Sequence, residues 1–103
     1  MFQDVYVFDG SQTFDIQQAH RKLAAGLGFP SFYSHNLDAL YDQLTTIGGR
    51  VKVIMVVIYP LDFIFNVGDE ARRFLSVLKE AAFQNPNFDL RMILNDYELR
   101  ADD

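Results

Sequence analysis

Residues 30–42 read PSFYSHNLDALYD and join an aromatic loop to a short helix. Leu37 and Leu40, with Leu44 just beyond, follow the i, i+3, i+7 spacing that forms one buried stripe on a helix. Asn36 precedes the first leucine and can cap the helix by accepting a hydrogen bond from an amide of its first turn. The stretch therefore predicts a capped helix that packs on a core through its leucines.

Two aspartates lie on the edge of this helix, beside the apolar stripe. Asp38 and Asp42 are four residues apart, so they stack on one edge, and Tyr41 falls between that edge and the stripe. Asp38 gains from the helix dipole, but a like-charge pair at this spacing costs roughly a few tenths of a kcal/mol, so local stability does not explain Asp42. Spacing alone leaves two interpretations open, a solvated helix face and a surface that captures a basic partner.

Three segments of the chain have strand character. They are Asp4–Phe8, Val51–Ile58 and Phe88–Leu94, and they alternate with helical segments, which favours a parallel sheet with helical crossovers. The central segment is nearly continuous β-branched and apolar sequence, which is typical of a strand buried on both faces of its sheet. We therefore expect an α/β fold in which a small three-stranded parallel sheet packs with helices.

Helical periodicity marks two further segments. In the first, Asp15 followed by Gln18 resembles a capping box, and Gly26 and Gly28 are expected to stop the helix. Residues 59–68 show no clean period and are expected to form a short helix or a loop. The expected apolar faces are Ile16, Ala19, Leu23 and Leu27 in the first helix, and Ala71, Phe74, Leu75, Leu78 and Ala82 in the second.

The composition predicts one small soluble binding domain over residues 1–94, followed by a partly disordered tail over residues 95–103. There is no cysteine, which excludes disulfides and thiolate catalysis. The formal charge of −5 argues against nucleic acid as the main partner. The longest apolar run, Val53 to Tyr59, is too short to cross a membrane, and the start of the chain does not resemble a signal peptide, so we expect a cytoplasmic protein.

Paired carboxylates can also act as a general acid and base, which makes a small hydrolase an alternative. It would need a pocket that joins Asp38 or Asp42 to His35. His20, within the first helix, is expected to be a structural or half-exposed residue, and the two histidines lack the spacing of a zinc site. We therefore expect no catalytic residues, no metal site and no cofactor.

The run FYSHNLDALYDQLT, residues 32–45, resembles the loop and second helix of the barstar family, intracellular protein inhibitors of a secreted bacterial ribonuclease. The central part of this run, residues 36–44, has a helix cap, three leucines and two acids at the positions that the family pattern requires. A weaker likeness extends to an upstream helix and to a downstream helix that is followed by a short strand. The resemblance implies a barstar-like α/β fold in a protein that is monomeric when free. It also implies a partner, a basic ribonuclease or a related basic toxin, whose active site this protein occludes without binding nucleic acid or membrane.

The resemblance also implies which residues bind the partner. Asp38 and Asp42 match the family's two acids on the inhibitory helix, Asp42 matches the one that reaches deepest into the nuclease site, and Glu80 matches a third acid in contact. Tyr33 is left open between core and contact. The full set is Phe32, Ser34, His35, Asn36, Asp38, Tyr41, Asp42, Thr45, Ile47 and Glu80.

The loop departs from the family at several positions. Phe32 stands where the family has a tyrosine and offers no hydroxyl, and Tyr41 replaces a tryptophan by a smaller aromatic residue. Ser34 replaces a glycine and His35 a glutamate, while Ile47 falls near another tryptophan of the family. These changes alter the shape of the loop and reduce its negative charge. A different basic protein as the partner of the same fold therefore remains an alternative.

Overall fold

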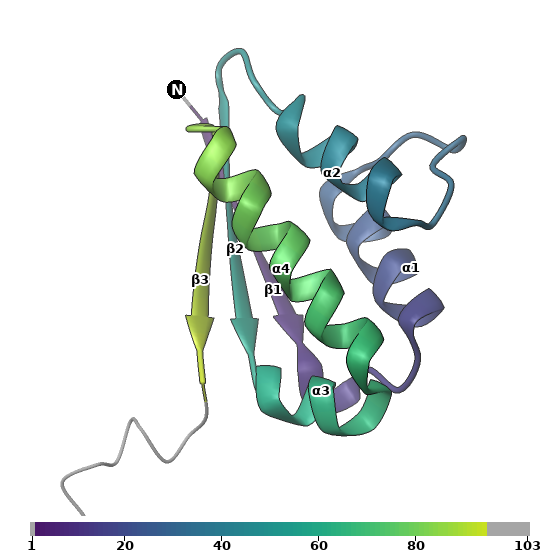
Figure 1. The fold of residues 1–103 in the computed structure, drawn as a ribbon. Coiled ribbons are helices and arrows are strands. Elements are labelled where there is room, and N and C mark those ends of the chain that lie inside the picture. The colour runs from purple at the N-terminus through teal and green to yellow at the C-terminus, as the bar shows by residue number, and fades with distance from the viewer. Residues whose placement is uncertain (1, 95–103) are drawn as a thin grey trace, which may run out of the picture.

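The computed structural model describes residues 2–94 (Figure 1). In chain order its elements are β1 (Phe2–Asp9), a 3₁₀ turn (Gly10–Gln12), α1 (Ile16–Leu27), α2 (Leu37–Thr45), β2 (Val51–Ile58), α3 (Pro60–Val67), α4 (Asp69–Gln84) and β3 (Phe88–Ile93). The sheet has the order β1-β2-β3 and both strand pairs are parallel, so the predicted three-stranded α/β architecture is confirmed. The expected disordered tail over residues 95–103 lies outside the described residues.

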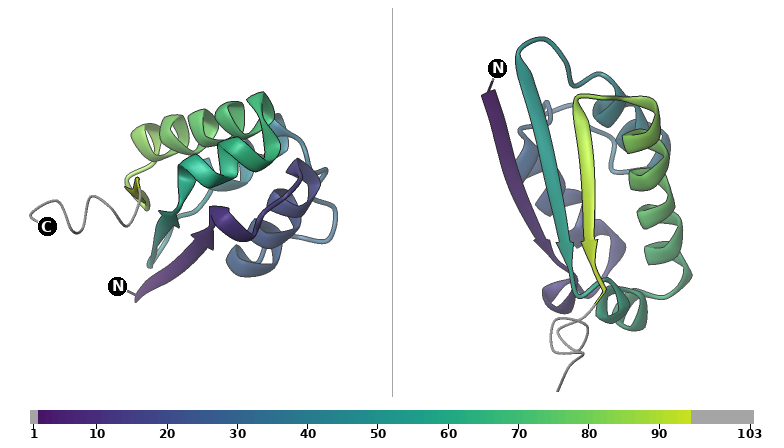
Figure 2. Two further views of the ribbon diagram at one scale, coloured as in Figure 1. Left: turned by 90° about the horizontal axis from the view of Figure 1, so that it is seen from below. Right: turned by 90° about the vertical axis from the view of Figure 1, so that its left-hand side faces the viewer.

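The helices α1, α2 and α4 cover one face of the sheet (Figure 2). The prediction that β2 is buried on both faces is wrong, because only alternate residues of β2, namely Val53, Met55 and Val57, are buried. On the opposite face, Val5 and Val7 of β1 are 63% and 53% exposed. A continuous apolar run thus forms a strand whose side chains alternate between a covered face and an open one.

The core lies between the sheet and the helices, with three phenylalanines at its centre. The ring of Phe8 on β1 meets that of Phe63 on α3 edge to face at 5.2 Å and stacks with that of Phe74 on α4 at 6.2 Å. From the second helix, Leu40 and Leu44 are fully buried in the same core, as the leucine stripe predicts. The core therefore fixes the rotation of α2 and with it the face that α2 turns to solvent.

The predicted N-terminal caps of α1 and α2 are both present. The Asn36 side chain accepts a hydrogen bond from the Ala39 amide at 2.8 Å, and the Asp15 carboxylate accepts one from the Gln18 amide at 2.8 Å. The return bond of the capping box is shifted by one residue, because the Gln18 side chain accepts from the Phe14 amide at 2.7 Å. Both helix starts are therefore set by local hydrogen bonds.

One of the two glycines expected to stop α1 has a different role. Gly28 ends the helix in the left-handed conformation with φ of 69°, as expected of a C-terminal glycine. Gly26 lies inside α1, where an added Cβ would come within 2.1 Å of the Tyr6 ring. Its lack of a side chain lets α1 approach β1 closely. Within the ambiguous residues 59–68, Pro60–Val67 form the helix α3, so the short-helix option is confirmed.

Candidate functional site

The most prominent feature of α2 is an open groove of about 410 Å³ between it and α4. The groove is lined by Leu37, Asp38, Tyr41, Asp42, Val77 and Glu80. Four of these are residues that the resemblance to the barstar family implies, and they come together from two helices that are far apart in the sequence. Leu37, which was expected only as part of the buried stripe, and Val77 are half-buried apolar side chains in the same groove.

The groove is acidic, and its acids have no cation of their own. Asp38, Asp42 and Glu80 are exposed, and within residues 2–94 none of them makes an ion pair. Like charges gathered around one hollow repel one another, so the arrangement costs free energy in the isolated protein. A cationic side chain placed in the groove would remove that repulsion and form charge-assisted hydrogen bonds.

The loop before α2 alternates exposed and buried side chains. Phe32 is 78% exposed and Ser34 is also exposed, whereas Tyr33 between them is only 7% exposed and belongs to the core. Of the two alternatives left open for Tyr33, a core residue or a partner contact, the structure favours the core residue. The Tyr33 amide donates to the Pro30 carbonyl at 3.0 Å, which closes a turn at the start of the loop. With Tyr33 fixed inward, its two neighbours face solvent.

A buried cluster of rings holds this loop against α1. The Nδ1 atom of His20 lies 2.5 Å from the hydroxyl oxygen of Tyr33, and the ring of His35 lies parallel to that of His20, at 13° and 6.0 Å between centroids. His20 is only 2% exposed. It is therefore a structural residue, as one of the two expectations had it, and it is not half-exposed. Burial, and to a lesser extent repulsion by His35, lowers the pKa of His20 to about 4. Burial also raises the pKa of Tyr33.

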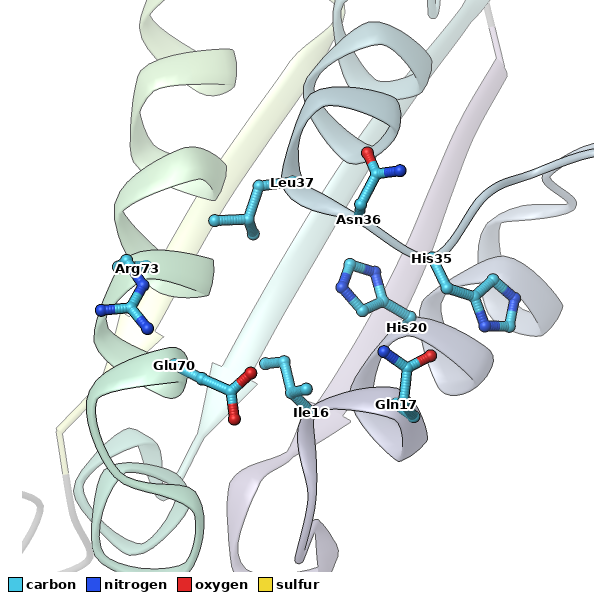
Figure 3. A pocket seen from close by; sticks show the side chains of 8 residues that line it. All are labelled: Ile16, Gln17, His20, His35, Asn36, Leu37, Glu70 and Arg73. Carbon is cyan, nitrogen blue, oxygen red and sulfur yellow. The ribbon is translucent and has the colours of Figure 1, made fainter.

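The two histidines line a pocket of about 210 Å³ where α1, the start of α2 and α4 meet (Figure 3). Its lining consists of Ile16, Gln17 and His20 from α1, His35, Asn36 and Leu37 from the loop and the start of α2, and Glu70 and Arg73 from α4. This pocket contains neither Asp38 nor Asp42, and the groove contains neither histidine. Neither hollow therefore brings together the residues that the hydrolase alternative requires.

Two predicted site residues, Thr45 and Ile47, lie at the C-terminal end of α2, outside both hollows. The Thr45 hydroxyl donates to the Tyr41 carbonyl at 2.7 Å, and Ile47 packs partly against the core. This end of α2 is held by Asn85 at the end of α4, a residue that was not predicted from the sequence. Its side-chain amide donates to the carbonyls of Leu44 and Ile47, each at 2.8 Å. An Asn-Pro pair at a helix end signals a stop but does not reveal such a long-range bond.

None of the helices formed by residues 2–94 has the length and apolar character needed to cross a lipid bilayer. In the same described region, no group of three or more His, Asp or Glu side chains is arranged to hold a metal ion.

The chain matches a known protein family over most of its length. The family model described as Barstar (barnase inhibitor) matches residues 3–95, which is nearly the whole chain. The matched region includes the loop, both helices of the groove and the complete β2 and β3 strands. A comparison with curated proteins found no match.

Proposed function

The chain belongs to the barstar family, and from that premise we propose that it inhibits a basic ribonuclease by covering the nuclease active site with the α2–α4 groove and the preceding loop. The observation that carries this proposal is the convergence of Asp38, Asp42 and Glu80 around one groove, where no described cation neutralises them. Four of the ten residues implied by the family resemblance line that groove.

The chemistry of the groove suits a ribonuclease. Such an enzyme holds its polyanionic substrate with arginine and lysine side chains, and carboxylates placed at the phosphate positions can occupy the same donors. Asp42 lies on the exposed edge of a helix whose rotation is fixed by the core, so it can be presented without rearrangement. The inhibitor then acts as a decoy for the phosphate backbone.

The charge of the chain also supports rapid association. The formal charge of −5 attracts a basic protein over a distance comparable to the Debye length, which is about 8 Å at physiological salt. Electrostatic attraction of this kind raises association rates, and the barnase–barstar pair is itself an example from which the rule was drawn. An inhibitor of a nuclease that is toxic to the cell benefits from such speed.

Apolar contacts complete the proposed interface. The exposed ring of Phe32 and the half-buried ring of Tyr41 lie on either side of the start of α2 in sequence and can cover apolar parts of the partner. We expect an interface of about 1,600 Å² in total. On this proposal the protein is monomeric when free, acts in the cytoplasm and requires no cofactor.

A second candidate keeps the same groove but assigns it a different basic protein, such as another toxin. The observation that favours this candidate is the loop, where residues 31–36 contain no acid and His35 stacks inward on His20. A loop of this character contributes no negative charge to the recognition of a nuclease.

The proposal is tested by titrating the protein into a barnase-type ribonuclease and following RNA cleavage at low and moderate salt. Asp42→Ala is measured alongside, with Asp62→Ala as the matched control. Asp62 is an exposed acid on α3, which lies at the opposite end of the sheet from α2 (Figure 1), and it does not line the groove. We expect stoichiometric inhibition that is lost in Asp42→Ala and kept in Asp62→Ala. Absence of inhibition at micromolar protein would reject the ribonuclease and favour another basic partner.

A further inference from the structure

Both histidines of the chain lie in a single stack behind the proposed binding loop. The sequence contains only two histidines, His20 and His35, and their rings are parallel within 13° at a centroid distance of 6.0 Å. The ring of Tyr33 contacts both, at 5.7 Å from His20 and 5.2 Å from His35. We call these three residues the histidine stack. Every imidazole that can take up a proton in this protein is therefore part of the contact between the loop and α1.

The direction of the hydrogen bond inside the histidine stack depends on the protonation of His20. A neutral imidazole can accept the Tyr33 hydroxyl proton at Nδ1 or donate to the hydroxyl oxygen, but an imidazolium can only donate. Protonation therefore fixes the direction of the bond and forces the Tyr33 hydroxyl proton to find another acceptor in a buried place.

We propose that the histidine stack positions the binding loop and that its protonation releases the loop, so that partner binding weakens in acid. This inference rests on the proposed function, since it concerns the regulation of the same binding surface. In these terms His20 and Tyr33 are positioning residues, because they are buried and act through Phe32, Ser34 and His35.

The surroundings of the stack do not offset an added charge. On α4, the ring of Phe74 meets His20 edge to face at 5.2 Å, while Glu70 and Arg73, of opposite charge, line the same pocket. The start of α2 contributes only Asn36 and Leu37, which are neutral. Burial and repulsion by His35 dominate and hold the pKa of His20 near 4, well below that of a free imidazole. The stack therefore favours the neutral form.

The backbone at His35 connects the stack to the acidic helix. His35 has φ of 52°, in the left-handed region, which is uncommon for a residue with a side chain. The next residue, Asn36, caps α2, and Asp38 follows in the first turn. Release of His35 would thus disturb the residue that fixes the start of the binding helix.

The size of the expected effect follows from proton linkage. The stack holds the pKa of His20 at about 4, whereas a released imidazole has the ordinary value of 6.5. Lowering the pH from 7.5 to 5 then shifts the equilibrium between stacked and released loop by about 30-fold toward release. The shift sets an upper limit on the loss of affinity, and we expect a loss of about tenfold.

The first test uses the free protein and needs no partner. The imidazole signals of His20 and His35 and the amide signals of residues 32–36 are followed by NMR between pH 7.5 and 4. We expect the loop amides to shift together with the titration of His20, and His35→Asn to raise the pKa of His20, because Asn tolerates the left-handed conformation but carries no charge. Loop amides that stay unchanged while His20 titrates would overturn the inference.

The second test compares the wild type with His20→Gln/His35→Asn, a variant without histidine, in binding to one barnase-type ribonuclease at pH 7.5 and pH 5. The titratable groups of the ribonuclease and the carboxylates of the inhibitor are the same in the wild type and in the variant. Their effect on Kd therefore cancels in the ratio of wild-type to variant Kd. We expect the ratio of wild-type to variant Kd to rise about tenfold at pH 5. A ratio that does not change with pH overturns the inference.

The two arms separate this inference from the proposed function. If no ribonuclease binds at either pH, the proposed function fails, and the amide titration alone decides the inference about the loop. If the double variant does not fold, as judged by circular dichroism, His35→Asn replaces it. We then expect the weaker repulsion in that variant to bring the pKa of His20 closer to that of a released imidazole and so to reduce the loss of affinity at pH 5, and an unchanged pH profile would count against the stack.

Discussion

The side-chain amide of Asn85 donates to the carbonyl oxygen of Leu44 at 2.8 Å and thereby ties the end of α4 to the end of α2. Asn85 is only 6% exposed, and its amide also reaches the Ile47 carbonyl at 2.8 Å. These two helices form the walls of the acidic groove, so one side chain links the two walls at their C-terminal ends.

Replacement of Asn85 by alanine should therefore destabilise the fold. The change leaves two carbonyls near the core without their donor, and we expect a loss of about 1–3 kcal/mol in the free energy of unfolding. Urea denaturation measures this loss. Gln84→Ala is the control, because Gln84 is exposed and adjacent on the same helix. Equal stability of the two variants would show that the bond is not important for the fold.

Removal of the Asp42 carboxylate should weaken partner binding more than removal of Glu80. A charged group buried at the centre of an interface costs at least about 2 kcal/mol when truncated, mostly through faster dissociation, whereas an acid nearer the rim mainly changes the association rate. Stopped-flow association and dissociation rates for Asp42→Ala and Glu80→Ala against a basic ribonuclease separate the two effects. A larger effect on the dissociation rate from Glu80→Ala than from Asp42→Ala would contradict this ranking.

Stability should fall as the pH is lowered from about 6.5 to about 4. The pKa of His20 is lowered from 6.5 in the unfolded chain to about 4 in the fold, so the unfolded state binds more protons over this interval. The contribution of neutral His20 is complete above pH 6.5 and is lost progressively toward pH 4, by up to about 3 kcal/mol.

Urea denaturation at several pH values measures this loss, and His20→Gln serves as the reference in which only carboxylates titrate. The wild type should lose more stability than His20→Gln between pH 6.5 and 4. Parallel curves for the two proteins would mean that His20 is not kept neutral by the fold.

Patterns among residues close in the sequence predicted much of this fold, whereas contacts between residues far apart in the sequence could not be predicted. The leucine stripe and the Asn36 cap depend on neighbours within one helix, and both were predicted correctly. The open face of the sheet was missed, because a continuous apolar run does not reveal which face the helices will cover. His20 looked like an ordinary helix residue, since its partner Tyr33 comes from a loop that only the tertiary fold brings near.

The acidic groove was predictable only in part for the same reason. Asp38 and Asp42 belong to one helix, so their common edge follows from spacing alone. The position of Glu80 opposite them depends on how α4 packs against α2, and only the family resemblance suggested it. The apolar lining contributed by Val77 had no signal in the sequence beyond the general pattern of its helix.

Gly26 should be intolerant of alanine although it lies inside a helix. Alanine normally stabilises a helix interior by about 1 kcal/mol relative to glycine. Here the new Cβ would lie within 2.1 Å of the Tyr6 ring, whose hydroxyl donates to the Lys22 carbonyl at 3.0 Å. We expect Gly26→Ala to cost about 1–3 kcal/mol through displacement of the ring. Thermal unfolding of Gly26→Ala in a Tyr6→Ala background is the decisive control, because there the substitution should be neutral or stabilising.

Phe32 and Tyr33 are neighbours in the loop, but substitutions at the two positions should have opposite effects. Phe32 is 78% exposed, so Phe32→Ala should change the free energy of unfolding by less than about 0.5 kcal/mol while weakening partner binding. Tyr33 is 7% exposed and bonded to His20, so Tyr33→Phe should lower stability by about 1–3 kcal/mol, because it leaves the buried imidazole without its partner. Urea denaturation and ribonuclease titration of both variants give the comparison. If Phe32→Ala destabilised the fold as much as Tyr33→Phe, the loop would depend on the exposed ring for its structure, and the division between a binding side and an anchoring side would be wrong.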